Sequence, residues 1–177
     1  NSEHKWCIEK YMGRSGDSIK SYPNVSNSLE NPSMENSSYV NYNIYFETKG
    51  RFEVDIYRMP TLNERGKVRF ALGLDDELPV VLYATNGYVN YSDGTDSWGK
   101  GVLQNNETLT TTITVQEKGY HTLRLYSVDT GVVIDKIVIR TGEEIKSYFG
   151  PPESYNPSYN KYANMKRQAM SYETYNY

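Results

Sequence analysis

Hydrophobic and polar residues alternate along most of the first 150 positions, and this period of two is the dominant pattern in the chain. A β-strand places successive side chains on opposite faces, so alternation predicts strands that are buried on one side. Apolar residues at helical spacing are nearly absent from the same region. The pattern predicts seven strands, over residues 38–46, 51–58, 67–75, 78–84, 108–115, 120–128 and 132–140.

The predicted core consists of the apolar positions that share one face of each strand. These positions are Val40, Tyr42, Ile44, Phe46, Phe52, Val54, Ile56, Val68, Phe70, Leu72, Leu74, Leu109, Thr111, Ile113 and Val115. The short connection Thr48-Lys49-Gly50 between the first two strands predicts a hairpin. Seven or more strands joined by Gly, Asn and Asp turns favour an all-β sandwich or barrel over alternating strands and helices.

Composition limits the number of domains and the classes of partner. The chain has 177 residues and a hydrophobic content of 37%, which suits one domain with a modest core. Lys and Arg number 19 against 22 Asp and Glu, and no basic block is present, so nucleic acid is not an expected partner. No apolar run approaches the length of a membrane span and no signal peptide is recognised, so a membrane is not expected either.

Tyrosine is strongly favoured over phenylalanine, with 18 Tyr against 4 Phe. Tyr rings can face both apolar matter and water, so this bias fits recognition of a polar ligand or simply a hydrated sandwich surface. Beyond residue 154 the sequence is rich in Tyr and Asn but lacks Leu, Ile and Val, so it cannot form a core. We therefore predict a β-sandwich over residues 1–154 and a Tyr-rich tail over 155–177, with a short helix in the tail as one reading.

Few residues suggest catalysis. The Gly-Asp-Ser sequence at 16–18 matches the start of a serine hydrolase motif, but Ser18 would need a nearby base, and no histidine follows His121. We interpret the motif as a turn. His4 and His121 do not have the spacing of a metal motif, and we interpret His121 as a hydrogen-bonded structural residue. Cys7 is the single cysteine, so neither an internal disulfide nor a Cys-rich zinc site can form.

The densest carboxylate cluster is Asp75, Asp76 and Glu77. A calcium ion needs oxygen ligands that converge, and glycoside hydrolysis needs two facing carboxyl groups. Adjacent residues in one β-turn point in different directions, and Asp is a common turn residue, so we interpret this cluster as a turn. The sequence assigns no catalytic residue, no certain cofactor and no metal ligand, and it leaves a structural calcium ion open.

The polar interval 85–107 contains the candidate carbohydrate-binding residues Trp98, Tyr88, Tyr91 and Lys100. Aromatic faces can stack on the C–H surfaces of sugars while polar groups bind the hydroxyls. We expect this interval to be a loop at one end of the sandwich. An equally good interpretation of Trp98 is that its ring closes one end of the core.

Several segments closely resemble the C-terminal domain of family 115 glycoside hydrolases, the xylan α-1,2-glucuronidases. GYHTLRLYSVDTGVVIDKIVIRTG followed by SYFGPPES is similar to the end of that domain, with Thr130 in place of a proline of the family. The other similar segments are WCIEKYMGRSGDSIKSYP, YVNYNIYFETKGRFEVDIYRMPTLN and VRFALGLDDELP. The resemblance covers roughly residues 6–154 in order, and the tail lies outside it.

The resemblance implies a jelly-roll β-sandwich of the galactose-binding-like kind, akin to the carbohydrate-binding modules that recognise uronic acids. It implies a non-catalytic accessory domain of an α-glucuronidase, whose catalytic carboxylates lie in preceding domains. The expected role is packing against the catalytic domain or formation of a homodimer. The alternative is an independent carbohydrate-binding module for glucuronoxylan or other uronic-acid-containing glycans of the plant cell wall. Either role implies a secreted, periplasmic or cell-surface location.

Overall fold

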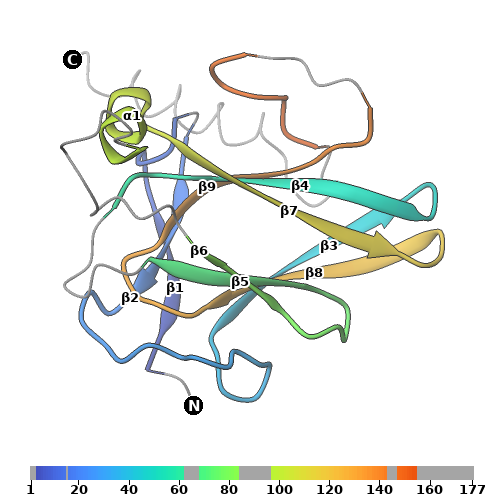
Figure 1. Cartoon of the computed structure of the whole chain (residues 1–177), viewed down its shortest axis with the longest axis horizontal. Helices are drawn as coiled ribbons and strands as arrows, with labels where there is room; N and C mark the ends of the chain where they lie inside the picture. Colours follow the sequence, from blue (N-terminus) through green and yellow to red (C-terminus); the bar gives the residue numbers. More distant parts are fainter. Residues whose placement is uncertain (1–2, 15, 62–67, 84–96, 143–146, 155–177) are drawn as a thin grey trace, which may run out of the picture. The chain divides into compact units, whose positions relative to one another are not determined.

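The computed structural model describes residues 3–14, 16–61, 68–83, 97–142 and 147–154 (Figure 1). The chain divides into two compact units, Asn1–Glu144 and Ile145–Tyr177. In the second unit the backbone N–H of Gly150 donates a hydrogen bond to the carbonyl of Ser147 at 3.2 Å, which closes a tight turn. The predicted tail, residues 155–177, lies outside the described residues, so its helix and its role stay predictions.

The described part of the first unit contains strands and one short helix. The elements are β1 (Lys5–Glu9), β2 (Ser18–Tyr22), β3 (Tyr39–Phe46), β4 (Gly50–Arg58), β5 (Arg69–Leu74), β6 (Val80–Tyr83), α1 (Ser97–Gln104), β7 (Glu107–Val115), β8 (Gly119–Ser127) and β9 (Val133–Ile139). Each of the seven predicted strands ends within two residues of its predicted bounds. β1 and β2 were not predicted. In β2, Ser18 and Ser21, which are small and polar, fill the buried positions and remove the alternation.

Two antiparallel sheets enclose the core (Figure 1). The larger sheet has the order β1-β2-β9-β4-β7 and the smaller sheet has the order β3-β8-β5-β6. Buried side chains from β4, β7 and β9 pack against others from β3, β5 and β8 in one hydrophobic cluster. The predicted all-β sandwich is therefore confirmed.

The predicted hairpin between 38–46 and 51–58 is wrong. β3 pairs with β8, whereas β4 pairs with β7 and β9, so the connection between β3 and β4 crosses from one sheet to the other. Their apolar faces meet across the core, where the rings of Phe46 and Phe52 have centroids 5.2 Å apart. Alternation determines which side chains face the core, but it does not determine which strand is the partner.

β5 and β8 are neighbours in the smaller sheet and carry polar residues at both of their ends. All six residues of β5 are buried, because the strand lies between β8 and β6. Arg69 begins this buried strand, and Asp75 directly follows it. Since the two strands run antiparallel, the end of β8 lies beside Arg69 and the beginning of β8 lies beside Asp75.

Candidate functional site

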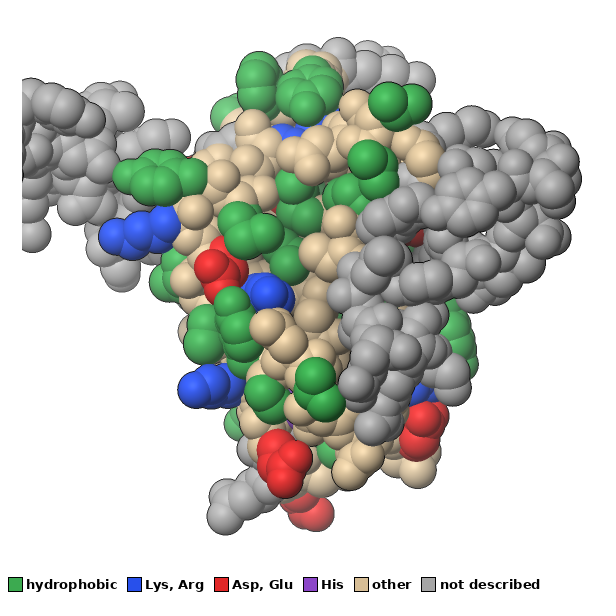
Figure 2. Space-filling view, turned by 90° about the vertical axis from the view of Figure 1, so that its left-hand side faces the viewer, with side chains coloured by type: hydrophobic (Ala, Val, Ile, Leu, Met, Phe, Trp, Pro, Cys, Tyr) green, Lys and Arg blue, Asp and Glu red, His purple; other side chains and the backbone are tan. Residues whose placement is uncertain are grey.

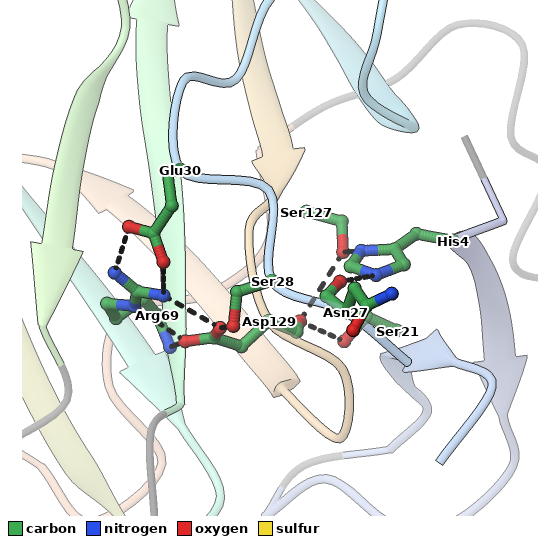
Figure 3. A network of polar contacts seen from close by, with 8 residues as sticks. All are labelled: His4, Ser21, Asn27, Ser28, Glu30, Arg69, Ser127 and Asp129. Carbon is green, nitrogen blue, oxygen red and sulfur yellow. Dashed lines mark hydrogen bonds and ion pairs between the residues drawn. The ribbon is translucent and has the colours of Figure 1, made fainter. Parts of the chain in front are cut away.

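A network of polar side chains lies at the end of the sandwich where the chain passes from β8 to β9 (Figure 3). The connection Asp129-Thr130-Gly131 crosses from the smaller to the larger sheet at this point. We call the set of side chains the Asp129 network. Its members are His4, Ser21, Asn27, Ser28, Glu30, Arg69, Ser127 and Asp129.

A buried ion pair forms the centre of the network. The Nε and Nη2 atoms of Arg69 donate to the two carboxylate oxygens of Asp129 at 2.8 and 3.0 Å, and the backbone N–H of Arg69 donates to Oδ2 at 2.9 Å. Figure 3 shows the guanidinium between the carboxylates of Asp129 and Glu30, and Glu30 accepts two further hydrogen bonds at 2.8 and 3.0 Å. A buried charge is tolerated when it is paired and fully hydrogen-bonded, and both conditions are met here.

These contacts set the protonation of the pair. Burial alone would raise the pKa of Asp129, but the hydrogen bonds from Arg69 and Ser28 outweigh burial and hold that pKa below its ordinary value. Hydrogen bonds to Asp129 and to Glu30 raise the pKa of Arg69. Asp129 is therefore an ionised structural group, with neither oxygen available to act as a general base.

The rest of the network fastens the beginning of the chain to the end of β8. The Nδ1 atom of His4 lies 2.9 Å from the hydroxyl of Ser127, and Nε2 lies 2.8 Å from the carbonyl of Asn27. A carbonyl only accepts hydrogen bonds, so Nε2 carries a proton. The hydroxyl of Ser21 donates to the carbonyl of Asp129 at 3.1 Å. The network thus stabilises the fold by connecting segments that are distant in sequence.

A polar hollow of about 380 Å³ opens beside His4. It is lined by Glu3, His4, Ser26, Asn27, Leu29, Glu35 and Asn36. Two of these residues carry carboxylates and none is Lys or Arg, so the charge of the lining disfavours an anionic ligand such as a uronate. Both ring nitrogens of His4 already have hydrogen-bonding partners, so the hollow holds no free base from this residue.

The predicted carbohydrate-binding residues are only partly placed. Tyr88 and Tyr91 lie outside the described residues. Trp98 and Lys100 lie on α1, but their side chains are not among those described. The assignment of these four residues to sugar binding therefore stays a prediction.

The expectation of an uninterrupted loop over 85–107 is wrong, because residues 97–104 form the helix α1. Gly99 and Gly101 lie within this helix, and glycine has low helix propensity, which hid the element from sequence reasoning. A side-chain carbon at Gly101 would lie 3.9 Å from Pro60 and 4.0 Å from Glu107. The helix therefore lies close to the end of β4 and the beginning of β7.

The acidic cluster at 75–77 is a turn, as predicted. The backbone N–H of Glu77 donates to the carbonyl of Leu74 at 3.0 Å, and Asp75 has a left-handed backbone with φ of 51°. A turn of this kind sends its three carboxylates in different directions. Among the described residues, no group of three or more His, Cys, Asp or Glu side chains could hold a metal ion.

His121 is hydrogen-bonded through both ring nitrogens, as predicted for a structural histidine. Nδ1 lies 2.7 Å from a carboxylate oxygen of Asp75, and Nε2 lies 2.8 Å from the carbonyl of Glu117. The contact with Asp75, followed by that with Glu117, raises the pKa of His121. Burial alone would raise the pKa of Asp75, but hydrogen bonds from the backbone of Thr122 and from His121 outweigh it, and the pKa is lowered.

Ser18 has no catalytic partner. It begins β2, its side chain is buried, and its hydroxyl has no hydrogen-bonding partner. A serine nucleophile needs a base within hydrogen-bonding distance, so the described residues support no catalytic role for Ser18. Ser18 itself belongs to a strand and not to the expected turn. No described helix is long and apolar enough to cross a membrane.

The surface seen in Figure 2 carries no concentrated charge in its described part. Hydrophobic side chains are interspersed with polar ones, and the basic and acidic side chains on this face are scattered. A nucleic-acid-binding surface would instead gather Lys and Arg, so this face does not have that character.

The sequence model of the glycosyl hydrolase family 115 C-terminal domain matches residues 1–153. No curated protein matches the chain. Among solved structures, the chain is similar to BtGH115A, a family GH115 4-O-methyl-α-glucuronidase with specificity for decorated arabinogalactans, at 20% identity and a TM-score of 0.55. That match covers 74% of this chain and 15% of BtGH115A, so the chain spans a small fraction of that protein's length.

The chain is also similar to a family 35 carbohydrate-binding module from Clostridium thermocellum, at 16% identity and a TM-score of 0.50. This match covers 76% of the chain and 86% of the module. At identities this low, both similarities show the fold alone. They agree with the sandwich described above.

Proposed function

Because this chain belongs to the family of glycosyl hydrolase family 115 C-terminal domains, and is therefore an accessory domain and not a catalytic module, we propose that it packs against a catalytic domain or a second subunit. The observation that carries this proposal is the exposed apolar edge of the smaller sheet. Among the described strands, β6 pairs with β5 alone, and the segment 78–83 contains no charged residue. Leu78 is 91% exposed, and Val80 and Tyr83 are exposed as well.

Apolar edge strands are a liability for an isolated domain, because unpaired backbone groups and apolar side chains invite association. A neighbouring domain that covered β6 would remove this liability. The small share of BtGH115A that the chain spans supports a partner of this kind, since most of that protein lies outside the matched region.

Sedimentation velocity of the chain, alone and mixed with the catalytic module of a family GH115 glucuronidase, tests this proposal. We expect association in one of the two samples, and we expect a Leu78→Lys and Val80→Lys double variant to weaken it at least about tenfold. Ile8→Lys, at an exposed position on the opposite edge of the sandwich, is the matched control and should leave association unchanged. Absence of association in both samples, or equal association of all variants, would contradict the proposal.

A second candidate function is independent binding of glucuronoxylan or another uronic-acid-containing plant glycan through Trp98, Tyr88, Tyr91 and Lys100. The glucuronidase activity and arabinogalactan specificity of BtGH115A support a glycan of this class. Binding of such a glycan would require a secreted, periplasmic or cell-surface location. Calorimetric titration with glucuronoxylan fragments and free glucuronic acid, with and without calcium, tests it. Saturable binding that Trp98→Ala abolishes is expected, and flat titrations from a folded protein would exclude this function.

A further inference from the structure

β3 and β8 lie side by side in the smaller sheet (Figure 1). Their register places side chains in pairs on the outer face of the sheet. Tyr42, Ile44 and Phe46 of β3 pack into the core, so the alternate positions face away from it. We call these outward residues of both strands the tyrosine ladder. Its four pairs are Tyr39 with Tyr126, Asn41 with Arg124, Asn43 with Thr122, and Tyr45 with Tyr120.

The ladder is open to solvent at one end. Tyr126 is buried, at the end of β8 where Ser127 donates a backbone hydrogen bond to Ser38 at 2.9 Å. At the other end, Tyr45 is 45% exposed and Tyr120 is 80% exposed. These two rings meet edge to face, with centroids 5.0 Å apart, so each fixes the orientation of the other.

The polar pairs between the tyrosines offer hydrogen-bonding groups along the strand direction. Asn41 and Asn43 are exposed, and Thr122 donates to the amide oxygen of Asn43 at 3.2 Å. Amides and hydroxyls both donate and accept, which suits the hydroxyl groups of sugars. An exposed tyrosine next to a row of such groups combines a stacking surface with hydroxyl recognition.

The cationic side chains beside the ladder are paired with carboxylates. The pairs are Lys118 with Glu47 at 3.0 Å and Arg124 with Asp76 at 3.8 Å. A uronic acid would have to displace one of these carboxylates and would be repelled by the other. The surface is therefore electrostatically suited to a neutral ligand.

We propose that the tyrosine ladder binds a neutral stretch of polysaccharide backbone, with the ring of Tyr120 as its main stacking surface. The hydroxyls of successive sugar units would contact Asn43, Asn41 and Thr122. This inference rests on the family to which the chain belongs and on the geometry of β3 and β8. It does not depend on packing at β6. It also differs from uronic-acid binding at Trp98, because it concerns another region and another class of sugar.

Calorimetric titration of the 177-residue chain with xylohexaose, galactohexaose and cellohexaose tests this proposal. We expect saturable binding of at least one neutral hexasaccharide, and a loss of affinity of about tenfold or more in Tyr120→Ala. Tyr11→Ala is the matched control, because Tyr11 is also 80% exposed but lies outside the smaller sheet. Raising NaCl from about 50 to about 500 mM should change the affinity less than about twofold, since no net charge is recognised.

Three results would overturn the proposal. The first is no binding of any of the three oligosaccharides by a protein whose circular dichroism shows it to be folded. The second is an equal loss of affinity in Tyr120→Ala and Tyr11→Ala. The third is a change from dimer to monomer in Tyr120→Ala, which would assign this face to a second copy of the chain. The Leu78→Lys and Val80→Lys double variant should bind sugar normally. Failure of sugar binding at the tyrosine ladder can therefore be distinguished from failure of packing at β6.

Discussion

The neighbouring strands β5 and β8 have one ion pair at each end, and the two pairs differ in their access to water. Arg69 at the beginning of β5 and Asp129 beyond the end of β8 are both buried. Asp75 beyond the end of β5 has a side chain that is nearly half exposed, and that of His121 near the beginning of β8 is 13% exposed. One protein scaffold therefore shows what burial does to a charge pair.

At the Asp129 end, water cannot replace a missing partner, so the loss of Arg69 leaves a buried carboxylate unpaired, and the loss of Asp129 leaves a buried guanidinium with Glu30 as its one carboxylate partner. At the His121 end, solvent reaches the Asp75 carboxylate and screens its attraction to His121. The two ends also differ in their expected response to pH. Asp129, at one end, has a lowered pKa, whereas His121, at the other end, has a raised pKa.

The largest effect should come from Asp129→Asn, which removes the charge while keeping the shape. We expect a loss of about 3 kcal/mol in the free energy of unfolding, because Arg69 remains buried with Glu30 as its remaining carboxylate. Urea denaturation at pH 7 measures this difference. Asp76→Asn is the control, because the side chain of Asp76 is 90% exposed. Equal losses in the two variants would mean that burial does not distinguish the two ends.

Acidification should reduce the advantage of the wild type over Asp129→Asn. The pKa of Asp129 is lowered in the folded state, so its contribution is fully present above the unfolded pKa of about 3.9. That contribution is lost as the pH falls through the folded-state pKa. Urea denaturation of both proteins between about pH 7 and pH 3 should therefore show converging stabilities, and a constant difference would contradict this explanation.

A smaller effect, with the opposite pH dependence, is expected for His121→Gln. The pKa of His121 is raised by Asp75, so its contribution is present below the unfolded pKa of about 6.5 and is lost as the pH rises through the folded-state pKa. Solvent screening limits the loss to about 0.5 kcal/mol at pH 5, and the loss should shrink as the pH rises through the folded-state pKa. NMR titration of the ring protons checks the direction of the pKa shift, and a pKa below about 6.5 would refute it.

The smallest effect should come from Lys118→Ala. Lys118 and Glu47 form an exposed pair at 3.0 Å, and both side chains are more than half exposed. An exposed pair of this kind contributes almost nothing to stability. The melting temperature should be unchanged within error, and a clear decrease would show that this region is less hydrated than its exposure indicates.

Alternation along the sequence was enough to predict the strands but not their arrangement. The pattern in 38–46 and 51–58 correctly separated inward from outward side chains. The partner of β3 is β8, which lies more than 70 residues later in the chain, and no local signal specifies that pairing. Proximity in sequence suggested a hairpin, but the two strands lie in different sheets and their apolar faces meet across the core.

The Asp129 network was not predicted because its members are polar and widely separated in sequence. His4, Arg69 and Asp129 come together only through the fold. One usable signal was Arg69 itself, a charged residue inside the apolar segment VRFALGL. Such a residue is buried with the strand and requires a carboxylate partner, although the sequence alone does not identify which one.

The crossing of the chain between sheets has a consequence for its synthesis. Of the strands that the structure describes, only β1 with β2 and β5 with β6 are both consecutive in the chain and paired, so β3 and β4 leave the ribosome long before their described partners exist. At roughly 5–20 residues per second, β3 waits several seconds for β8. The nascent sandwich therefore exposes unpaired strand edges during this interval, and closes only when β9 enters the middle of the larger sheet.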